Sequence, residues 1–197
     1  MRTDSTLAAS ARDYFDHLGE LLSVLDAGRV DALAERVFEA WRENRQVLVC
    51  GNGGSASTAS HYVTDFVKTA AVDGQRRLRA LCLNDNAPMQ SALGNDLGYE
   101  ETFVYPLATY ADVGDLLIAI SGSGTSANVV LACEWACRNG LELAALTGFD
   151  GGTIGPMADL HLNVPSDNYG AIEDLHMSIG HIVTQTLHAR VRAATTG

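Results

Sequence analysis

Two loops rich in glycine and serine carry groups that could bind a phosphate. The first spans residues 51–56 (Gly-Asn-Gly-Gly-Ser-Ala) and the second residues 121–126 (Ser-Gly-Ser-Gly-Thr-Ser). Each follows an apolar, strand-like run and precedes a helical one. Glycines let the backbone approach a ligand closely, and a helix start offers free N–H groups at its positive end. Each loop alone is also typical of a tight turn, with Ser126 as a helix cap, but the two together favour a phosphate site.

His61 and Asp65 form a second group that could do chemistry, four residues apart in the helical stretch after the first loop. Residues at positions i and i+4 share one face of a helix. An imidazole and a carboxylate on one face can ligate one metal ion or act as an acid–base pair. The same spacing occurs on solvated helix faces, so the pair by itself leaves these alternatives open.

The composition excludes several classes of partner. The chain has 197 residues, 47% of them hydrophobic, which is enough for one compact core. Lys and Arg number 13 against 24 Asp and Glu, a formal net charge of -11. Such a charge repels nucleic acid and anionic lipid, so we expect neither a nucleic-acid partner nor a membrane partner. A bound anion must then be held by backbone N–H groups and helix ends.

Neither the apolar runs nor the cysteines indicate secretion. No apolar run has the length of a membrane span, and residues 1–5 lack the pattern of a signal peptide. The four cysteines (Cys50, Cys82, Cys133 and Cys137) show no CxxC spacing. We therefore expect a cytoplasmic protein with buried free thiols.

The hydrophobic periodicity predicts the α/β elements that position these groups. Strands are expected over residues 46–50, 79–83, 115–120, 142–147 and 160–164. Helices are expected over residues 3–27, 30–44, from about 56, 88–93, 99–110, 126–139 and from 171 to about 192. Apolar strands alternating with helices predict a doubly wound parallel five-stranded sheet, flanked by helices and preceded by two N-terminal helices. Ligands bind at the carboxyl ends of such strands, where both loops lie.

Several stretches resemble the sugar isomerase (SIS) domain, and within it the phosphoheptose isomerases. They are Cys50–Ala56, Ala59–His61, Ala92–Tyr99, Ile120–Gly124, Leu146–Gly152 and Ile172–His176. The resemblance covers nearly the whole chain, and no linker separates its parts. It implies a single SIS domain over residues 1–197, with an N-terminal helical pair (1–44) and an α/β core (45–197). It also implies a homotetramer with its sites near subunit interfaces.

The resemblance further implies a set of contacts with a phosphorylated sugar. The phosphate contacts fall on Ser55, Ser121, Ser123 and Ser126, beside Asn52 and the backbone of Gly53, Gly54 and Gly122. Asn95 and Asp96 match an Asn-Asp pair that contacts sugar hydroxyls, although the same pair is also typical of a helix-terminating turn.

By the same resemblance, one Zn²⁺ per subunit would be held by His61, Asp65, Glu173 and His181. Two of these depart from the family, since Asp65 stands where a glutamate is usual and Glu173 where a glutamine is usual. Glu173 and His181 are eight residues apart, a rise of about 12 Å along a helix, so both side chains must lean together to share an ion. Glu173 is also expected to contact the substrate. Lys68, the only lysine, lies one position from the family's basic residue and could contact the substrate.

The function implied is an aldose–ketose isomerase that converts D-sedoheptulose 7-phosphate to D-glycero-D-manno-heptose 7-phosphate. Proton transfer through an enediol needs a base and an acid, for which Asp65 and His181 are the candidates. One alternative is a non-catalytic SIS protein that binds a sugar phosphate or a replication-initiator partner. Another is an isomerase of a different phosphosugar. Regulatory members tend to lose the final histidine, so the presence of His181 favours an enzyme.

Overall fold

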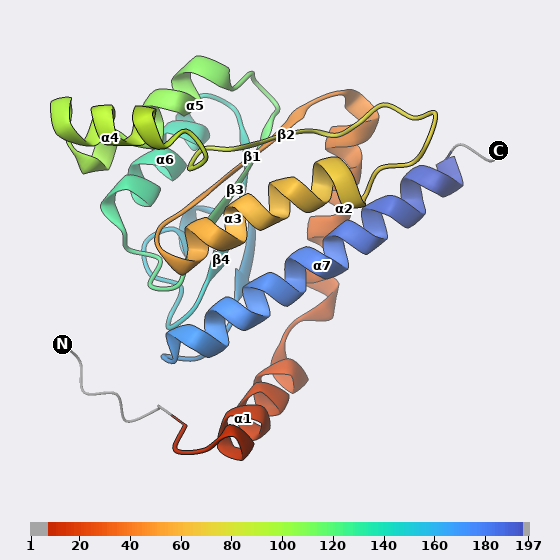
Figure 1. Cartoon of the computed structure of the whole chain (residues 1–197), viewed down its shortest axis with the longest axis vertical. Coiled ribbons are helices and arrows are strands. Elements are labelled where there is room, and N and C mark those ends of the chain that lie inside the picture. Colours follow the sequence, from red (N-terminus) through yellow and green to blue (C-terminus); the bar gives the residue numbers. More distant parts are fainter. Residues whose placement is uncertain (1–7, 195–197) are drawn as a thin grey trace.

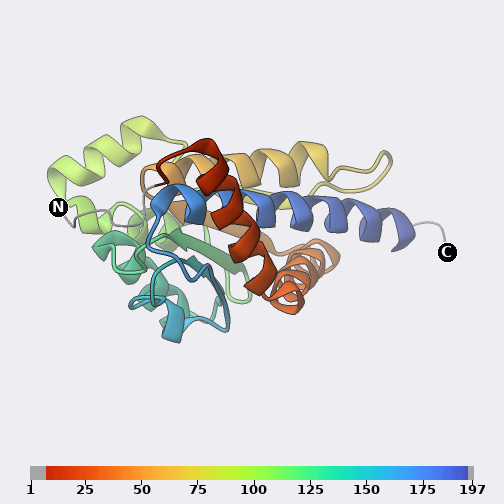
Figure 2. The ribbon, with the colours of Figure 1, turned by 90° about the horizontal axis from the view of Figure 1, so that it is seen from below.

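The computed structural model describes residues 8–194 and has a central parallel sheet with helices on both faces (Figures 1 and 2). The strands are β1 (Gln46–Gly51), β2 (Arg79–Cys82), β3 (Leu116–Ser121), β4 (Glu142–Thr147) and β5 (Leu160–Asn163). The helices are α1 (Ala11–Val24), α2 (Ala27–Glu43), α3 (Gly54–Thr64), α4 (Ala87–Asp96), α5 (Val104–Tyr110), α6 (Ala127–Arg138) and α7 (Tyr169–Ala194). Short turns of helix are η1 (Asp65–Thr69, π-helical), η2 (Tyr99–Glu101) and η3 (Gly155–Met157).

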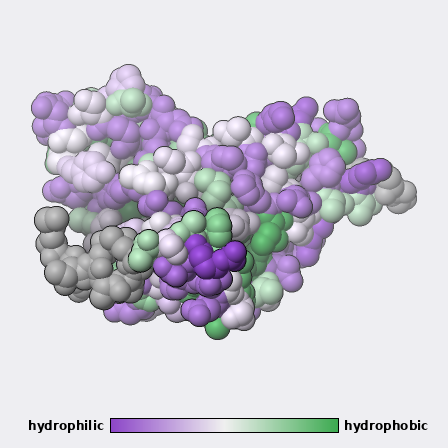
Figure 3. Space-filling model, turned by 60° about the horizontal axis from the view of Figure 1, so that its bottom comes forward, coloured by the Kyte–Doolittle hydropathy of each residue, from purple (hydrophilic) through white to green (hydrophobic). Residues whose placement is uncertain are grey.

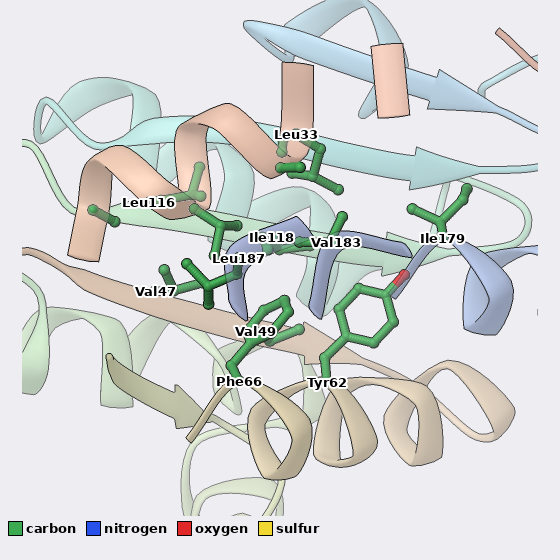
Figure 4. Packing of buried hydrophobic residues seen from close by; sticks show 14 of the residues in the cluster. Leu33, Val47, Val49, Tyr62, Phe66, Leu116, Ile118, Ile179, Val183 and Leu187 are labelled. Carbon is green, nitrogen blue, oxygen red and sulfur yellow. The ribbon is translucent and has the colours of Figure 1, made fainter. Parts of the chain in front are cut away.

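The sheet has the strand order β2-β1-β3-β4-β5, and all its neighbours are parallel. Successive residues of a strand point to opposite faces. Val47 and Val49 therefore join the cluster under α2, α3 and α7 (Figure 4), whereas Leu48 and Cys50 join the cluster under α5 and α6. Both faces are thus covered, which confirms the predicted doubly wound five-stranded sheet.

The predicted strands and the two leading helices are present, and most boundaries differ by a few residues. The first helix was expected from Thr3 to Ala27, whereas α1 begins after Ser10, whose side chain caps it by accepting from the Asp13 N–H at 3.2 Å. Residues 1–7, including the start of that prediction, lie outside the described part. The helical segment predicted over 99–110 is present in two pieces, η2 and α5, and not as one continuous helix. Pro106 has no N–H to bond the carbonyl of Thr102, so a helix can only restart just before it.

The thiols follow the prediction with one exception. All four cysteines are free; Cys50, Cys82 and Cys133 are buried, but Cys137 is exposed on α6. None of the described helices is long and apolar enough to cross a membrane.

The loops after β1 and β3 lie side by side because these two strands are neighbours in the middle of the sheet. A Cβ at Gly51 would lie 2.7 Å from the carbonyl oxygen of Ser55 and 2.8 Å from that of Ile120, so only glycine fits where the chain leaves β1 for α3. Gly53 has a φ of 55°, a left-handed conformation that glycine adopts readily. The two glycines turn the chain from β1 straight into α3.

His176 connects α7 to the carboxyl ends of the strands, where the two loops also lie. Its side chain is fully buried, and its Nε2 lies 3.0 Å from the carbonyl oxygen of Thr147 at the end of β4. The carbonyl requires the Nε2–H tautomer, and Nδ1 has no partner. Burial lowers the pKa of His176 to about 4, although the Thr147 carbonyl opposes the shift.

We expect this depressed pKa to make stability depend on pH. An unfolded histidine titrates near 6.5, so between about pH 6.5 and 4 the unfolded chain binds a proton that the folded chain does not. The contribution of neutral His176 is complete above pH 6.5 and is lost as the pH falls toward 4, by about 3 kcal/mol in all. Urea unfolding of the wild type and of His176→Gln, which keeps an N–H donor, measures it. Equal slopes of unfolding free energy against pH in both proteins would contradict the prediction.

Candidate functional site

The two predicted loops enclose a cavity of about 230 Å³ at the carboxyl ends of β1 and β3. It lies at the starts of α3, α6 and α7. Its lining comprises Asn52, Gly53, Gly54, Ser55, Ser121, Gly122, Ser123, Ser126, Tyr169 and Glu173. All eight loop residues predicted from the sequence are therefore brought together. We call this cavity the loop pocket.

The loop pocket presents hydrogen-bond donors and no lysine or arginine. Ser126 occupies the N-cap position of α6, but its side chain makes no capping hydrogen bond. Gly53 caps α3 and has no side chain to do so. The Val129 N–H of α6 donates to Oδ1 of Asn128 at 3.0 Å. Neither N-cap side chain bonds the N–H groups at the start of its helix, so these groups can donate to an anion at the positive ends of two helix dipoles.

Asn52 joins the two loops by a reciprocal pair of amide hydrogen bonds. Its Nδ2 donates to Oδ1 of Asn128 at 2.8 Å, and Nδ2 of Asn128 donates to Oδ1 of Asn52 at 3.0 Å. The hydroxyl of Tyr99 also donates to Oδ1 of Asn52, at 2.8 Å. Asn52 lines the pocket, as expected for a substrate contact. Its side-chain hydrogen bonds, however, hold the start of α6 against the first loop.

His61, Asp65 and His181 form a separate cluster, with one ligand atom of each within 4.8 Å of the others. Nε2 of His61 lies 3.3 Å from Oδ2 of Asp65 and 3.1 Å from Nε2 of His181. Two imidazoles and one carboxylate, with a position left open, are a donor set typical of a catalytic zinc site. The residues therefore fit a zinc ion. We call them the His–Asp–His cluster.

Tyr62 sets the spacing between the helices that carry this cluster. Its ring is buried among core residues (Figure 4), and its hydroxyl donates to the backbone carbonyl of His176 on α7. A Cβ at Gly180 would overlap the Tyr62 ring, so the absent side chain lets α3 and α7 approach. His61 and His181 are the sequence neighbours of these two residues, which is why their rings meet with centroids 5.1 Å apart.

Glu173 lies apart from the His–Asp–His cluster, contrary to its expected place as a fourth ligand. It lines the loop pocket, and its carboxylate fills the space where a Cβ of Gly54 would be. The reason is that α3 and α7 run side by side in one direction (Figure 1), so residue 173 faces residue 54 while residue 181 faces residue 61. Two turns of helix keep Glu173 and His181 apart.

Three further predicted residues remain outside both groups. Asn95 and Asp96 lie at the end of α4, where the side-chain amide of Asn95 donates to Oδ1 of Asp96 at 2.7 Å. Neither lines the loop pocket. Lys68 is exposed on η1.

A family model described as the SIS domain matches residues 13–148. The chain belongs to the SIS domain family. The phosphoheptose isomerase of Chlorobaculum tepidum is 37% identical over 174 residues, covering 87% of this chain and 83% of that one. The lincomycin biosynthesis protein LmbN of Streptomyces lincolnensis is 37% identical over 188 residues, covering 90% of this chain and 68% of that one.

The solved structures give the same result. The phosphoheptose isomerase of Neisseria gonorrhoeae is 29% identical, with a TM-score of 0.83 over 90% of this chain and 96% of that one. The resemblance to the SIS domain and to phosphoheptose isomerases is therefore confirmed, and so is the SIS fold.

Two residues that shape the loop pocket of this SIS domain have no signal in the sequence: one lies behind the lining and one belongs to it. Asn128 is buried behind Asn52, but these residues are 76 positions apart and no local pattern links them. Tyr169 lines the pocket at the start of α7, packs edge-on against Phe149, and lies 3.0 Å from the place that a Cβ at Gly122 would take. An aromatic residue at a helix start has no distinctive spacing, so only the fold reveals it.

We expect Asn128 and Ser126 to respond in opposite ways to substitution. Asn128→Leu leaves the amide of Asn52 without its partner, which should lower the free energy of unfolding by about 1–3 kcal/mol. Ser126→Ala removes a hydroxyl that caps nothing, so stability should change by less than about 0.5 kcal/mol, while affinity for inorganic phosphate falls. Urea unfolding and phosphate titration measure both. Unchanged phosphate affinity in Ser126→Ala would mean that this loop is only a turn.

Proposed function

We propose that this protein is a phosphoheptose isomerase, an intramolecular aldose–ketose isomerase that converts D-sedoheptulose 7-phosphate to D-glycero-D-manno-heptose 7-phosphate. The observation that carries the proposal is the pairing of two different sites on the same two helices. The loop pocket, which is lined by neither lysine nor arginine and suits an anion, lies where α3 and α7 begin. The His–Asp–His cluster lies two turns further along the same helices. Similarity to enzymes named phosphoheptose isomerase supports the same activity.

The separation of the two sites suits a sugar phosphate of this length. Gly54 and His61 are seven residues apart on α3, a rise of about 10 Å. An extended chain advances about 1.2 Å per bond, so eight bonds from C1 to the phosphorus of a heptose 7-phosphate span about 10 Å. With its phosphate on the serine loops, such a sugar places C1 and C2 beside the cluster.

The reaction moves protons between neighbouring carbons. From the ketose, a base removes a proton from C1 while an acid protonates the oxygen on C2, which gives the enediol. Return of a proton to C2 and loss of the proton on the C1 oxygen then yield the aldehyde. We assign the base and the acid to Asp65 and His181, whose ligand atoms lie within 4.8 Å of each other; each would act in this role only while it is not held as a metal ligand.

We propose one zinc ion per subunit, held by His61, Asp65 and His181. When bound, zinc supplies a Lewis acid that stabilises negative charge on the oxygens of C1 and C2. Glu173 is then a substrate contact rather than a metal ligand, because its carboxylate lines the loop pocket.

We further propose a cytoplasmic homotetramer in which each chain forms a single SIS domain and the sites lie near subunit interfaces. On α1, Phe15, Leu22 and Val24 are exposed (62%, 54% and 63%), and apolar residues are visible among the polar ones in the view that brings this part forward (Figure 3). A subunit interface would cover them. It would also allow Asn95 and Asp96, exposed at the end of α4, to contact sugar hydroxyls.

The proposed tetramer can be tested by measuring the mass of the assembly in solution. We expect light scattering at micromolar protein to give about four times the mass of one chain, since the apolar residues of α1 gain burial on association. Phe15→Glu, which puts a charge on this surface, should dissociate the assembly, whereas Asp16→Lys next to it should not. A monomeric wild type would contradict the proposal.

The activity is tested with sedoheptulose 7-phosphate and analysis of the product. Asp65→Asn and His181→Ala should each lower kcat about 10²–10⁴-fold, because each removes an acid or a base. KM should change little, since the phosphate is held by the loops. Asp65→Glu should stay active, and Ser178→Ala, at a half-buried position of α7 outside the His–Asp–His cluster, is the matched control.

Two results would overturn the assignment. Full turnover by His181→Ala would place the chemistry elsewhere. Absence of turnover by the metal-loaded wild type, with sugar phosphate still bound, would favour a non-catalytic SIS protein or another phosphosugar substrate.

A further inference from the structure

The turn that follows α3 is not α-helical. Over Asp65–Thr69 the chain forms a π-helical turn, in which the N–H of Ala70 donates to the carbonyl of Asp65 at 2.8 Å. Such turns are rare and occur frequently at functional sites. This one contains a member of the His–Asp–His cluster at its first position and Thr69 at its last.

The two oxygens of the Asp65 carboxylate have different partners: one contacts Thr69 and the other contacts the cluster. The hydroxyl of Thr69 donates to Oδ1 at 2.8 Å, while Oδ2 lies 3.3 Å from Nε2 of His61. The torsion that turns a carboxylate about its last bond is broad, so without a hydrogen bond on one oxygen the group could turn away from the cluster or present both oxygens to it. The Thr69 hydrogen bond occupies one oxygen, Oδ1, and leaves the other, Oδ2, facing the cluster.

Thr69 is exposed, which separates this contact from the packing of the core. The side chain of Asp65 is only 17% exposed, so the groups around it restrict its orientation, and Thr69 is the one that donates a hydrogen bond to Oδ1. Ligating carboxylates are usually hydrogen-bonded by an outer residue, and loss of that residue typically costs 10–100-fold in metal affinity.

We propose that Thr69 is a positioning residue that orients the Asp65 carboxylate so that Oδ2 alone is offered as a metal ligand. The inference rests on the proposed zinc site, but it does not depend on which sugar is isomerised.

The test measures Zn²⁺ affinity of the full-length protein, stripped with a chelator and titrated in competition with a chromophoric chelator. Thr69→Val keeps the shape of the side chain and removes the hydroxyl, so its Kd for Zn²⁺ should rise about 10–100-fold. Thr69→Ser keeps the hydroxyl and should stay within about threefold of the wild type. In an Asp65→Asn background, Thr69→Val should cause little further loss, because the two residues act through one bond.

The outcomes distinguish this inference from the proposed function. Equal Zn²⁺ affinity in Thr69→Val and the wild type overturns it, as does an equal loss in Thr69→Val and Thr69→Ser, which would indicate packing rather than the hydroxyl. A wild type that binds no Zn²⁺ overturns it together with the zinc site. A protein that binds Zn²⁺ with the expected order of affinities but does not isomerise the heptose phosphate overturns only the proposed function.

Discussion

The close approach of α3 and α7 decides where the polar groups of the site lie. It depends on one contact, the Tyr62 ring lying on Gly180, with the Tyr62 hydroxyl donating to the carbonyl of His176. Because the two helices run in the same direction, their starts meet at the loop pocket. About two turns further along, His61 of α3 meets His181 of α7. A side chain at position 180 would separate the helices and with them the two imidazoles.

The sheet supplies the second constraint. When both faces of a parallel sheet are covered, ligands can reach it mainly at the ends of its strands. The loops at the carboxyl ends lead directly into helix N-termini. The positions of β1 and β3 as neighbours put two such termini side by side. His176 then ties α7 to the end of β4, which brings the third helix start to the same place. Three helix starts thus converge at one edge of the sheet.

The sequence predicted the parts of this arrangement that depend on local pattern. Apolar runs, glycine loops and the i, i+4 pair of His61 and Asp65 are visible in a window of a few residues. Contacts between distant segments are not, which is why the amide pair of Asn52 and Asn128 was missed. Glu173 was placed with the metal by resemblance alone, whereas the parallel course of α3 and α7 opposes it to Gly54. The π-helical turn at Asp65 has no signature in composition.

Charge explains why the position of Glu173 matters under the proposed function. The chain carries a net charge of -11, and neither lysine nor arginine lines the loop pocket, so the phosphate must be neutralised by helix N-termini and hydroxyls. A carboxylate close to that phosphate would weaken binding by repulsion. The phosphate is therefore best accommodated on the side of Ser121, Ser123 and Ser126, away from Glu173. Glu173 then faces the sugar, where its oxygens can accept hydrogen bonds from hydroxyl groups. The Glu173 carboxylate thus repels the phosphate and accepts hydrogen bonds from the sugar hydroxyls. Both effects orient the bound sugar with its phosphate at the serine loop and its carbonyl end toward the His–Asp–His cluster.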